Sequence, residues 1–235
     1  MLEVTSLSCG YGDIIVAREL SFSVNEGEVL SVIGANGAGK SSTLNCLCGI
    51  VEKKRGSICI NGVEIGALIP EQRIQHGIAL VPEGRRVFPD LSVNENLTVG
   101  GHIVDRKLLE TNREKVFSYF PRLGERPKQL AGSLSGGEQQ MLAFGRALMS
   151  LPKLLLVDEM SLGLMPKVVD ECYQVLQDLK DKGVAIILVE QNTERALAVA
   201  DHVLVIEAGN LYWQGSSAEL AQNPAVVEAM MGSSA

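Results

Sequence analysis

A glycine-rich segment at residues 34–42 contains the residue types that recognise a phosphate group. It reads Gly-Ala-Asn-Gly-Ala-Gly-Lys-Ser-Ser and fits the P-loop pattern, in which two glycines separated by four residues precede Lys40 and Ser41. Small residues let backbone N–H groups approach an anion, Lys40 brings a positive charge to the β- and γ-phosphates, and the Ser41 hydroxyl can bind Mg²⁺. A glycine-rich turn that matches by chance would not lie, as this segment does, between an apolar run at 29–33 and a helical pattern from 43. The sequence therefore predicts a nucleoside triphosphate site with these contacts: Asn36, Gly37, Ala38, Gly39, Lys40, Ser41 and Ser42.

Two adjacent carboxylates follow another apolar run. Asp158 and Glu159 come directly after residues 154–157, which have the composition of a buried strand. At the carboxyl end of a parallel strand, Asp158 can hold the water shell of Mg²⁺, and Glu159 can orient and polarise the water that attacks the γ-phosphate. The other interpretation is an acidic strand end before a turn. Beside a P-loop we favour the catalytic interpretation.

A second pattern suited to anions lies at residues 134–140, which read Leu-Ser-Gly-Gly-Glu-Gln-Gln and open a predicted helix. Ser135, Gly136 and Gly137 at a helix start expose N–H groups at the positive end of the helix dipole. Ser135 with Glu138 three residues later is also a capping box, and both interpretations can hold together. A single nucleotide does not require two such helix starts.

Composition limits the class of protein. The 235 residues suit one domain, and a net charge of −7 argues against a dedicated nucleic-acid partner, which would favour a basic face. The five cysteines form no Cys-x-x-Cys pair and the three histidines are scattered, so we expect no zinc site and a reducing compartment. The N-terminus lacks a secretory signal, and the longest apolar run, at 184–189, is too short to cross a bilayer. Membrane association would therefore require a partner, and the tail at 232–235 is predicted to be disordered.

In their order along the chain, the P-loop, the 134–140 segment and the Asp158-Glu159 strand resemble the ATP-binding subunit of ABC transporters. The resemblance covers essentially the whole chain, and the 134–140 segment, as the family's signature, is far more specific than the P-loop. Residues 81–89 (Val-Pro-Glu-Gly-Arg-Arg-Val-Phe-Pro) and 188–192 (Leu-Val-Glu-Gln-Asn) further resemble the LivF-type ATPase of branched-chain amino acid importers.

The resemblance implies an α/β fold of the P-loop NTPase class, with a RecA-like, mostly parallel sheet. We expect a single ABC ATPase domain over 1–235, with 1–83 and 141–235 forming the nucleotide-binding core and 84–140 an inserted helical subdomain. An antiparallel β-subdomain should come from residues before about 63, including strands at 2–7, 14–24 and 56–60.

The resemblance also implies the partners and the remaining site residues. Two such subunits, identical or different, would form a head-to-tail dimer around two ATP molecules, with each signature facing the γ-phosphate on the other subunit. The dimer would drive a transmembrane permease from the cytoplasmic face of the bacterial inner membrane, with a solute-binding protein delivering the cargo. The segment 83–88 would receive a cytoplasmic helix of the permease. Arg85 and Arg86 would either contact the permease or form a solvated edge.

Several positions carry an implied role or depart from the family pattern. Tyr11 would stack on adenine, although from the residues alone it is equally a loop tyrosine that half covers a sheet edge. Glu83 stands where a glutamine usually contacts Mg²⁺ and the attacking water, and Gln191 stands where a histidine is usual. A glutamine can donate a hydrogen bond but cannot carry a positive charge. Met160 and Met165 replace a proline and an aspartate.

The alternative functions concern the cargo and the partner. Related ATPases serve urea, amides or other small polar solutes, and an ATPase subunit does not touch the cargo. A soluble ABC-type ATPase acting on DNA or ribosomes is less consistent with the sequence, because no sustained heptads separate Lys40 from Ser135 and only one ATPase domain is present.

Overall fold

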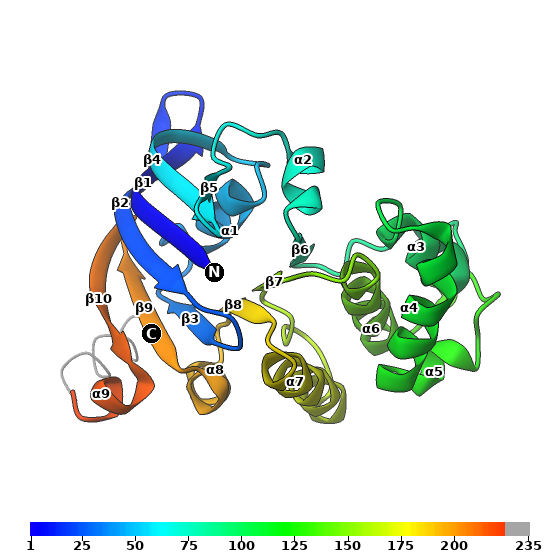
Figure 1. The fold of residues 1–235 in the computed structure, drawn as a ribbon. Coiled ribbons are helices and arrows are strands. Elements are labelled where there is room, and N and C mark those ends of the chain that lie inside the picture. Colours follow the sequence, from blue (N-terminus) through cyan, green and yellow to red (C-terminus); the bar gives the residue numbers. More distant parts are fainter. Residues whose placement is uncertain (224–235) are drawn as a thin grey trace.

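The chain forms two β-sheets with helices packed around them, in a computed structural model that describes residues 1–223 (Figure 1). The larger sheet has the strand order β10-β9-β3-β8-β7-β6, and all its neighbouring strands are parallel except β10 and β9. Its strands are β3 (Val29–Ile33), β6 (Ile78–Val81), β7 (Leu154–Asp158), β8 (Ala185–Val189), β9 (His202–Glu207) and β10 (Asn210–Ser216). The central strands are nearly continuous runs of Val, Ile and Leu, as expected for a parallel sheet covered on both faces. The predicted mostly parallel sheet is confirmed.

The smaller sheet is antiparallel and has the order β2-β1-β4-β5. Its strands are β1 (Leu2–Tyr11), β2 (Ile14–Val24), β4 (Glu52–Ile60) and β5 (Val63–Glu64). The prediction that Tyr11 lies in a loop after a strand at 2–7 was wrong, because Tyr11 pairs with Ile14 and extends β1. The expected start of a strand at residue 56 was also late, since Glu52 pairs with Gly10. Local composition could not reveal these long-range pairings.

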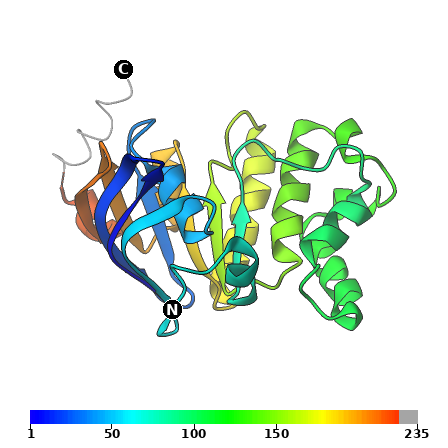
Figure 2. The ribbon, with the colours of Figure 1, turned by 90° about the horizontal axis from the view of Figure 1, so that it is seen from above.

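The helices lie mainly after residue 90, and the helices predicted after the P-loop and from the 134–140 segment are confirmed. They are α1 (Lys40–Leu47), α2 (Pro70–Gln75), α3 (Val93–Gly100), α4 (Arg106–Tyr119), α5 (Pro121–Gly124), the 3₁₀ turn η1 (Ala131–Ser133), α6 (Gly136–Leu148), α7 (Pro166–Asp181), α8 (Thr193–Val199) and α9 (Ser217–Ala221). Helices α3 to α6 gather at one end of the molecule, and the antiparallel sheet lies at the other (Figures 1 and 2). The subdomain boundaries at 84 and 140 remain a prediction, and the tail at 232–235 lies outside the described residues.

Alternate residues of the parallel sheet enter two different cores. On β7, Leu154 and Leu156 pack with α1 and the antiparallel sheet, whereas Leu155 and Val157 pack with α6 and α7. This alternation follows from the two-residue side-chain period of a strand. The sheet is therefore a rigid layer that holds α1 on one face and α6 and α7 on the other.

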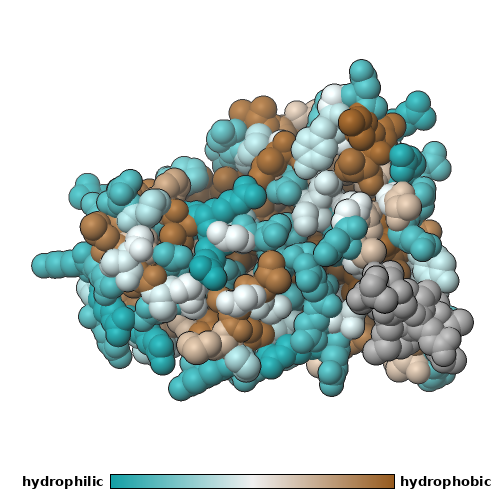
Figure 3. Space-filling model, turned by 180° about the vertical axis from the view of Figure 1, so that it is seen from behind, coloured by the Kyte–Doolittle hydropathy of each residue, from teal (hydrophilic) through white to brown (hydrophobic). Residues whose placement is uncertain are grey.

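The surface and the cysteines bear on the expected membrane and redox behaviour. No helix within residues 1–223 is long and apolar enough to cross a membrane. Seen from behind, the surface is mainly hydrophilic, with apolar side chains in separate groups (Figure 3). All five cysteines are free, and Cys46 and Cys48 are buried.

Candidate active site

The carboxyl ends of adjacent parallel strands form one edge of the larger sheet. The P-loop follows β3, Glu83 follows β6, Glu159 follows β7 and Gln191 follows β8. The ends are level, because Val189 of β8 pairs with both Val32 and Asp158. Ligands of open α/β sheets bind outside this edge. The loops enclose a cavity of about 460 Å³ that is lined by Asn36, Gly37, Gly39, Lys40, Ser41, Ser42, Glu83, Glu159 and Gln191, together with Val16.

Glycines allow the P-loop to lie directly against neighbouring backbone. A Cβ atom on Gly39 would lie 2.7 Å from the Val16 carbonyl oxygen, and Gly39 also has φ 100°. A Cβ atom on Gly34 would lie 2.1 Å from the Ile206 carbonyl oxygen. Helix α1 then begins at Lys40 without a side-chain cap, which leaves its first N–H groups directed at the cavity.

Lys40 is buried, and its ammonium group is held by the loop itself. Nζ donates to the carbonyl oxygens of Gly34, at 2.8 Å, and Ala35, at 3.1 Å. Burial lowers the pKa of Lys40, and the nearby carboxylates of Glu159 and Asp158 oppose that shift. The ammonium group thus lies between the loop and the acidic strand ends.

Ser41 and Asp158 form the part of the site that suits a divalent cation. Ser41 Oγ donates to Asp158 Oδ1 at 2.8 Å, and Asp158 is only 4% exposed. Burial raises the pKa of Asp158 to about 6, and the charges of Glu159 and Glu83 add to the shift. An excess of carboxylates over the single ammonium group of Lys40 favours a bound cation, and hydroxyl and carboxylate oxygens are the donors that Mg²⁺ prefers.

The protein supplies only part of a metal coordination shell. Among residues 1–223 no group of three or more His, Cys, Asp or Glu side chains could hold a metal ion. A magnesium ion typically takes one or two carboxylates and completes its shell with water and substrate phosphates. The donor set of Ser41 and Asp158 therefore fits Mg²⁺ that arrives with a nucleotide.

Glu159 occupies an uncommon backbone conformation. It has φ 46°, which side chains other than glycine rarely adopt, and its N–H donates to the Val189 carbonyl at 2.9 Å. Gln191 Nε2 donates to Glu159 Oε2 at 2.8 Å. The buried carboxylate of Glu190 accepts hydrogen bonds from Ser161 N at 3.1 Å and Oγ at 2.6 Å, which ties the loop after Glu159 to the end of β8. These contacts hold the Glu159 carboxylate at the cavity.

Two residues predicted to contact the nucleotide lie outside the cavity lining. Tyr11 is 55% exposed, and its hydroxyl lies 3.5 Å from Ser42 Oγ beside the cavity. Ala38 lies beneath the loop, because its methyl group packs in the core and its N–H donates to the Ala35 carbonyl at 3.1 Å. Val16, which the sequence reasoning missed, lines the cavity from β2 and carries no chemical signal of its own.

The 134–140 segment does not line this cavity either. Ser135 is the N-cap of α6: its Oγ accepts from Glu138 N at 3.4 Å and donates to Glu138 Oε2 at 2.7 Å. Arg126 in turn pairs with Glu138 at 2.7 Å. The capping interpretation is thus observed. Arg85, one of the two arginines expected either to contact the permease or to form a solvated edge, has its guanidinium group against Gly136.

Comparisons with known proteins agree with this arrangement. The sequence model of the ABC transporter family matches residues 17–161. The chain is 46% identical over 232 residues to the high-affinity branched-chain amino acid transport ATP-binding protein BraG of Pseudomonas aeruginosa, covering 99% of this chain and 100% of BraG. It is 33% identical to the probable branched-chain amino acid transport ATP-binding protein LivF of Archaeoglobus fulgidus, covering 99% of both chains. A solved structure of an ATP-binding subunit of an ABC transporter superimposes with a TM-score of 0.87 at 27% identity, covering 98% of both chains.

Proposed function

The chain belongs to the ATP-hydrolysing subunits of the ABC transporter family, and from this premise we propose that it powers the uptake of branched-chain amino acids. The observation that carries the choice of cargo is the 46% identity to BraG along the whole length of both chains. Full-length coverage matters because the similarity includes the segments that would contact a permease as well as the P-loop. The cargo itself would be selected by the permease and a solute-binding protein.

We assign MgATP to the cavity beside the P-loop. The N–H groups at the start of α1 and the Lys40 ammonium would bind the β- and γ-phosphates. Ser41, Asp158 and Glu83 would hold Mg²⁺, whose charge would neutralise the phosphate oxygens. Tyr11 would stack its exposed ring on adenine from the edge of the cavity.

The hydrolytic step would depend on Glu159. Its carboxylate lines the cavity and is oriented by Gln191, so it can accept a proton from a water molecule that attacks the γ-phosphate. Gln191 retains a second N–H for the γ-phosphate. The hydrogen bonds from Ser161 to Glu190 would keep the Glu159 carboxylate facing that water.

A second copy of an ABC ATPase would complete the site. Ser135, Gly136 and Gly137 start a helix with the geometry of an anion site, but they do not line the P-loop cavity of their own chain. A head-to-tail dimer would bring them to the γ-phosphate on the other subunit. The exposed Met165, in the loop after the Glu159 strand, would lie at that dimer interface.

A groove suited to the permease lies between α2 and α3. We call this the α2–α3 groove; its cavity of about 290 Å³ is lined by Ile50, Pro70, Ile74, Phe88 and Val99. Ile50, Phe88 and Val99 are exposed apolar side chains, and the Arg146 guanidinium lies 5.0 Å from the centre of the Phe88 ring. An apolar face of a cytoplasmic permease helix would cover them. The protein would then be held at the cytoplasmic face of the membrane through that permease.

The test is to purify the chain from its own cells with membrane partners retained and to identify the associated proteins. We expect a permease pair, a second ABC ATPase or a second copy of this chain, and a solute-binding protein. Phe88→Asp should remove the permease while leaving the ATPase activity of the chain alone unchanged, because it places a charge in the α2–α3 groove and not in the nucleotide cavity. Recovery of ribosomal or DNA-repair proteins in place of a permease would contradict the proposal.

A further inference from the structure

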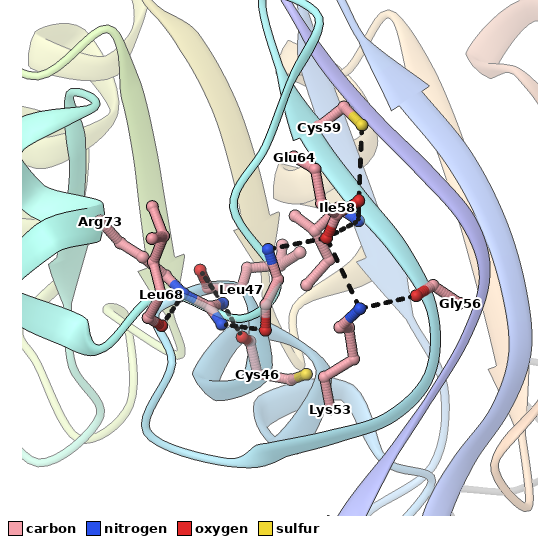
Figure 4. A network of polar contacts seen from close by, with 10 residues as sticks. Cys46, Leu47, Lys53, Gly56, Ile58, Cys59, Glu64, Leu68 and Arg73 are labelled. Atoms are coloured by element: carbon pink, nitrogen blue, oxygen red, sulfur yellow. Dashed lines mark hydrogen bonds and ion pairs between the residues drawn. The ribbon is translucent and has the colours of Figure 1, made fainter.

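Arg73 on α2 is a buried cation whose hydrogen-bond partners are main-chain carbonyl groups (Figure 4). It is 3% exposed. Its Nη1 donates to the carbonyl oxygens of Cys46, at 2.6 Å, and Leu47, at 3.0 Å. Its Nε donates to Leu68 O and its Nη2 to Gly66 O, each at 2.9 Å. The planar guanidinium group thus joins the end of α1, the segment before α2, and α2 itself.

The two carbonyl groups that Nη1 binds lie at the carboxyl end of the P-loop helix. The last carbonyl groups of a helix have no partner within it, and they form the negative end of its dipole. Helix α1 has no basic residue in its own last turn, so Arg73 supplies that cation from α2. Since α1 has 8 residues, it spans about 12 Å between this end and the phosphate-binding end that starts with Lys40.

The segment around Gly66, whose carbonyl group Arg73 binds, is held by the antiparallel sheet (Figure 4). The N–H of Gly66 donates to Glu64 Oε1 at 2.8 Å, and the Ile58 N–H donates to Glu64 Oε2 at 3.2 Å. Lys53 lies 3.5 Å from Glu64 and also donates to the Gly56 carbonyl at 2.7 Å. The segment to which Arg73 binds is therefore held to β4 and β5.

The same α2 and the same end of α1 form part of the α2–α3 groove. Arg73 lines the groove together with Pro70 and Ile74 of α2. Cys48 and Ile50, which directly follow α1, also line it. Whatever fills the groove thus contacts the elements that Arg73 joins.

We propose that Arg73 is a positioning residue for the nucleotide site: it fixes the P-loop helix at its carboxyl end and makes the position of that helix depend on what occupies the α2–α3 groove. The role of the groove rests on the proposed docking of a permease helix. Arg73 itself does not touch the nucleotide cavity, and it acts through α1.

The first experiment uses the purified full-length chain with MgATP and compares the wild type with Arg73→Met and Arg73→Lys. Arg73→Met keeps an unbranched apolar stem but removes the guanidinium group and all its donors. We expect the KM for MgATP to rise about tenfold, the size of one of the four charge-assisted hydrogen bonds that the variant loses, while kcat changes less than about twofold. Arg73→Lys should restore part of the loss, because an ammonium group can still donate to the α1 carbonyls.

A raised KM with a nearly unchanged kcat distinguishes a positioning role from a purely structural one. A variant that only unfolds more easily loses active protein, which lowers kcat and leaves KM unchanged. Arg113→Met is the matched control, since Arg113 on α4 bonds to Glu110 and Thr98 instead of to carbonyl groups of α1. A KM for Arg73→Met equal to that of the wild type and of Arg113→Met overturns the positioning role.

The second experiment measures turnover of the same variants assembled with the permease in membrane vesicles. We expect the permease to stimulate the wild type and to stimulate Arg73→Met less than half as much, although the permease stays bound. Equal stimulation of the two overturns the link between groove and P-loop. If the permease does not stimulate the wild type at all, the proposed function fails instead, and the KM comparison still decides whether Arg73 positions α1.

Discussion

Asp158 and Glu159 are adjacent carboxylates with different surroundings. Asp158 is buried at the end of β7, is bonded by Ser41, and has a pKa raised to about 6. Glu159 projects from a left-handed backbone position to the cavity and accepts a hydrogen bond from Gln191. Environment, and not residue type, thus separates a carboxylate suited to a cation from one suited to a water molecule.

Glu159→Gln should abolish turnover while leaving nucleotide binding intact. The amide keeps the size of the side chain and can still accept the Gln191 hydrogen bond, but it cannot take a proton from water. Losing a general base lowers kcat by roughly 100-fold or more. Phosphate release and binding of a fluorescent ATP analogue would be measured side by side. Glu194→Gln, on the surface of α8, is the control, and near-normal turnover in Glu159→Gln would assign the base elsewhere.

The raised pKa of Asp158 predicts a pH-dependent stability for the nucleotide-free protein. Because this carboxyl binds its proton more tightly when folded, it stabilises the fold fully below pH 3.8, and that contribution is lost as the pH rises through about 6. Asp158→Asn cannot ionise, so at pH 7.5 it should raise the free energy of unfolding by up to about 3 kcal/mol relative to the wild type. Urea unfolding between pH 4 and pH 8 would measure the difference.

The difference between Asp158→Asn and the wild type should shrink toward zero as the pH approaches 4. Asp90→Asn, at an exposed position, serves as the control for removing one carboxylate. A difference that does not change with pH would show that burial of the Asp158 charge does not cause it.

At the scale of elements, one local device is used three times within residues 1–223. Helices α3, α6 and α9 each start with a serine N-cap and a glutamate three residues later, in reciprocal hydrogen bonds. Only the box at α6 lies in the segment that we assign to the phosphate of another subunit. The cap of α9, built from Ser216 and Glu219, therefore provides an internal reference for what capping alone contributes.

Ser135→Asp should separate capping from phosphate recognition. Aspartate keeps an acceptor for the Glu138 N–H but cannot donate to Glu138 Oε2 as the Ser135 hydroxyl does, and its charge would repel a γ-phosphate at the same helix start. We expect ATP turnover of the assembled protein to fall about fivefold, which corresponds to the roughly 1 kcal/mol of one charge effect at a helix terminus. Ser216→Asp loses the same hydroxyl donor to Glu219 in α9, so it should change the melting temperature by a similar amount while leaving turnover near wild type. Equal turnover in the two variants would contradict a role of α6 in the active site.

At the scale of the whole molecule, the sequence predicted those parts of the fold that depend on local pattern. No long-range information is needed to recognise the apolar runs of β3, β7 and β8. The same holds for the residue types of the P-loop and of the Asp158-Glu159 strand end. Parallel pairing then brings the predicted residues to one edge of the sheet.

The remaining features depend on contacts between distant segments. Tyr11 belongs to a strand because of its pairing with Ile14, and Val16 reaches the cavity because Gly39 packs against its carbonyl group. Arg73 gave no signal in the sequence, since an arginine in a short helix is normally a surface residue. Only the fold shows that its guanidinium group is buried against the end of α1.

The most direct test of the central claim is ATP-driven uptake by the reconstituted complex. Proteoliposomes would contain the permease, its solute-binding protein and either the wild-type chain or Glu159→Gln, with radiolabelled leucine or urea outside. We predict uptake of leucine, but not of urea, that requires MgATP and disappears with Glu159→Gln. Leucine uptake that persists with Glu159→Gln, or MgATP hydrolysis by the wild-type complex without any leucine uptake, would contradict the account.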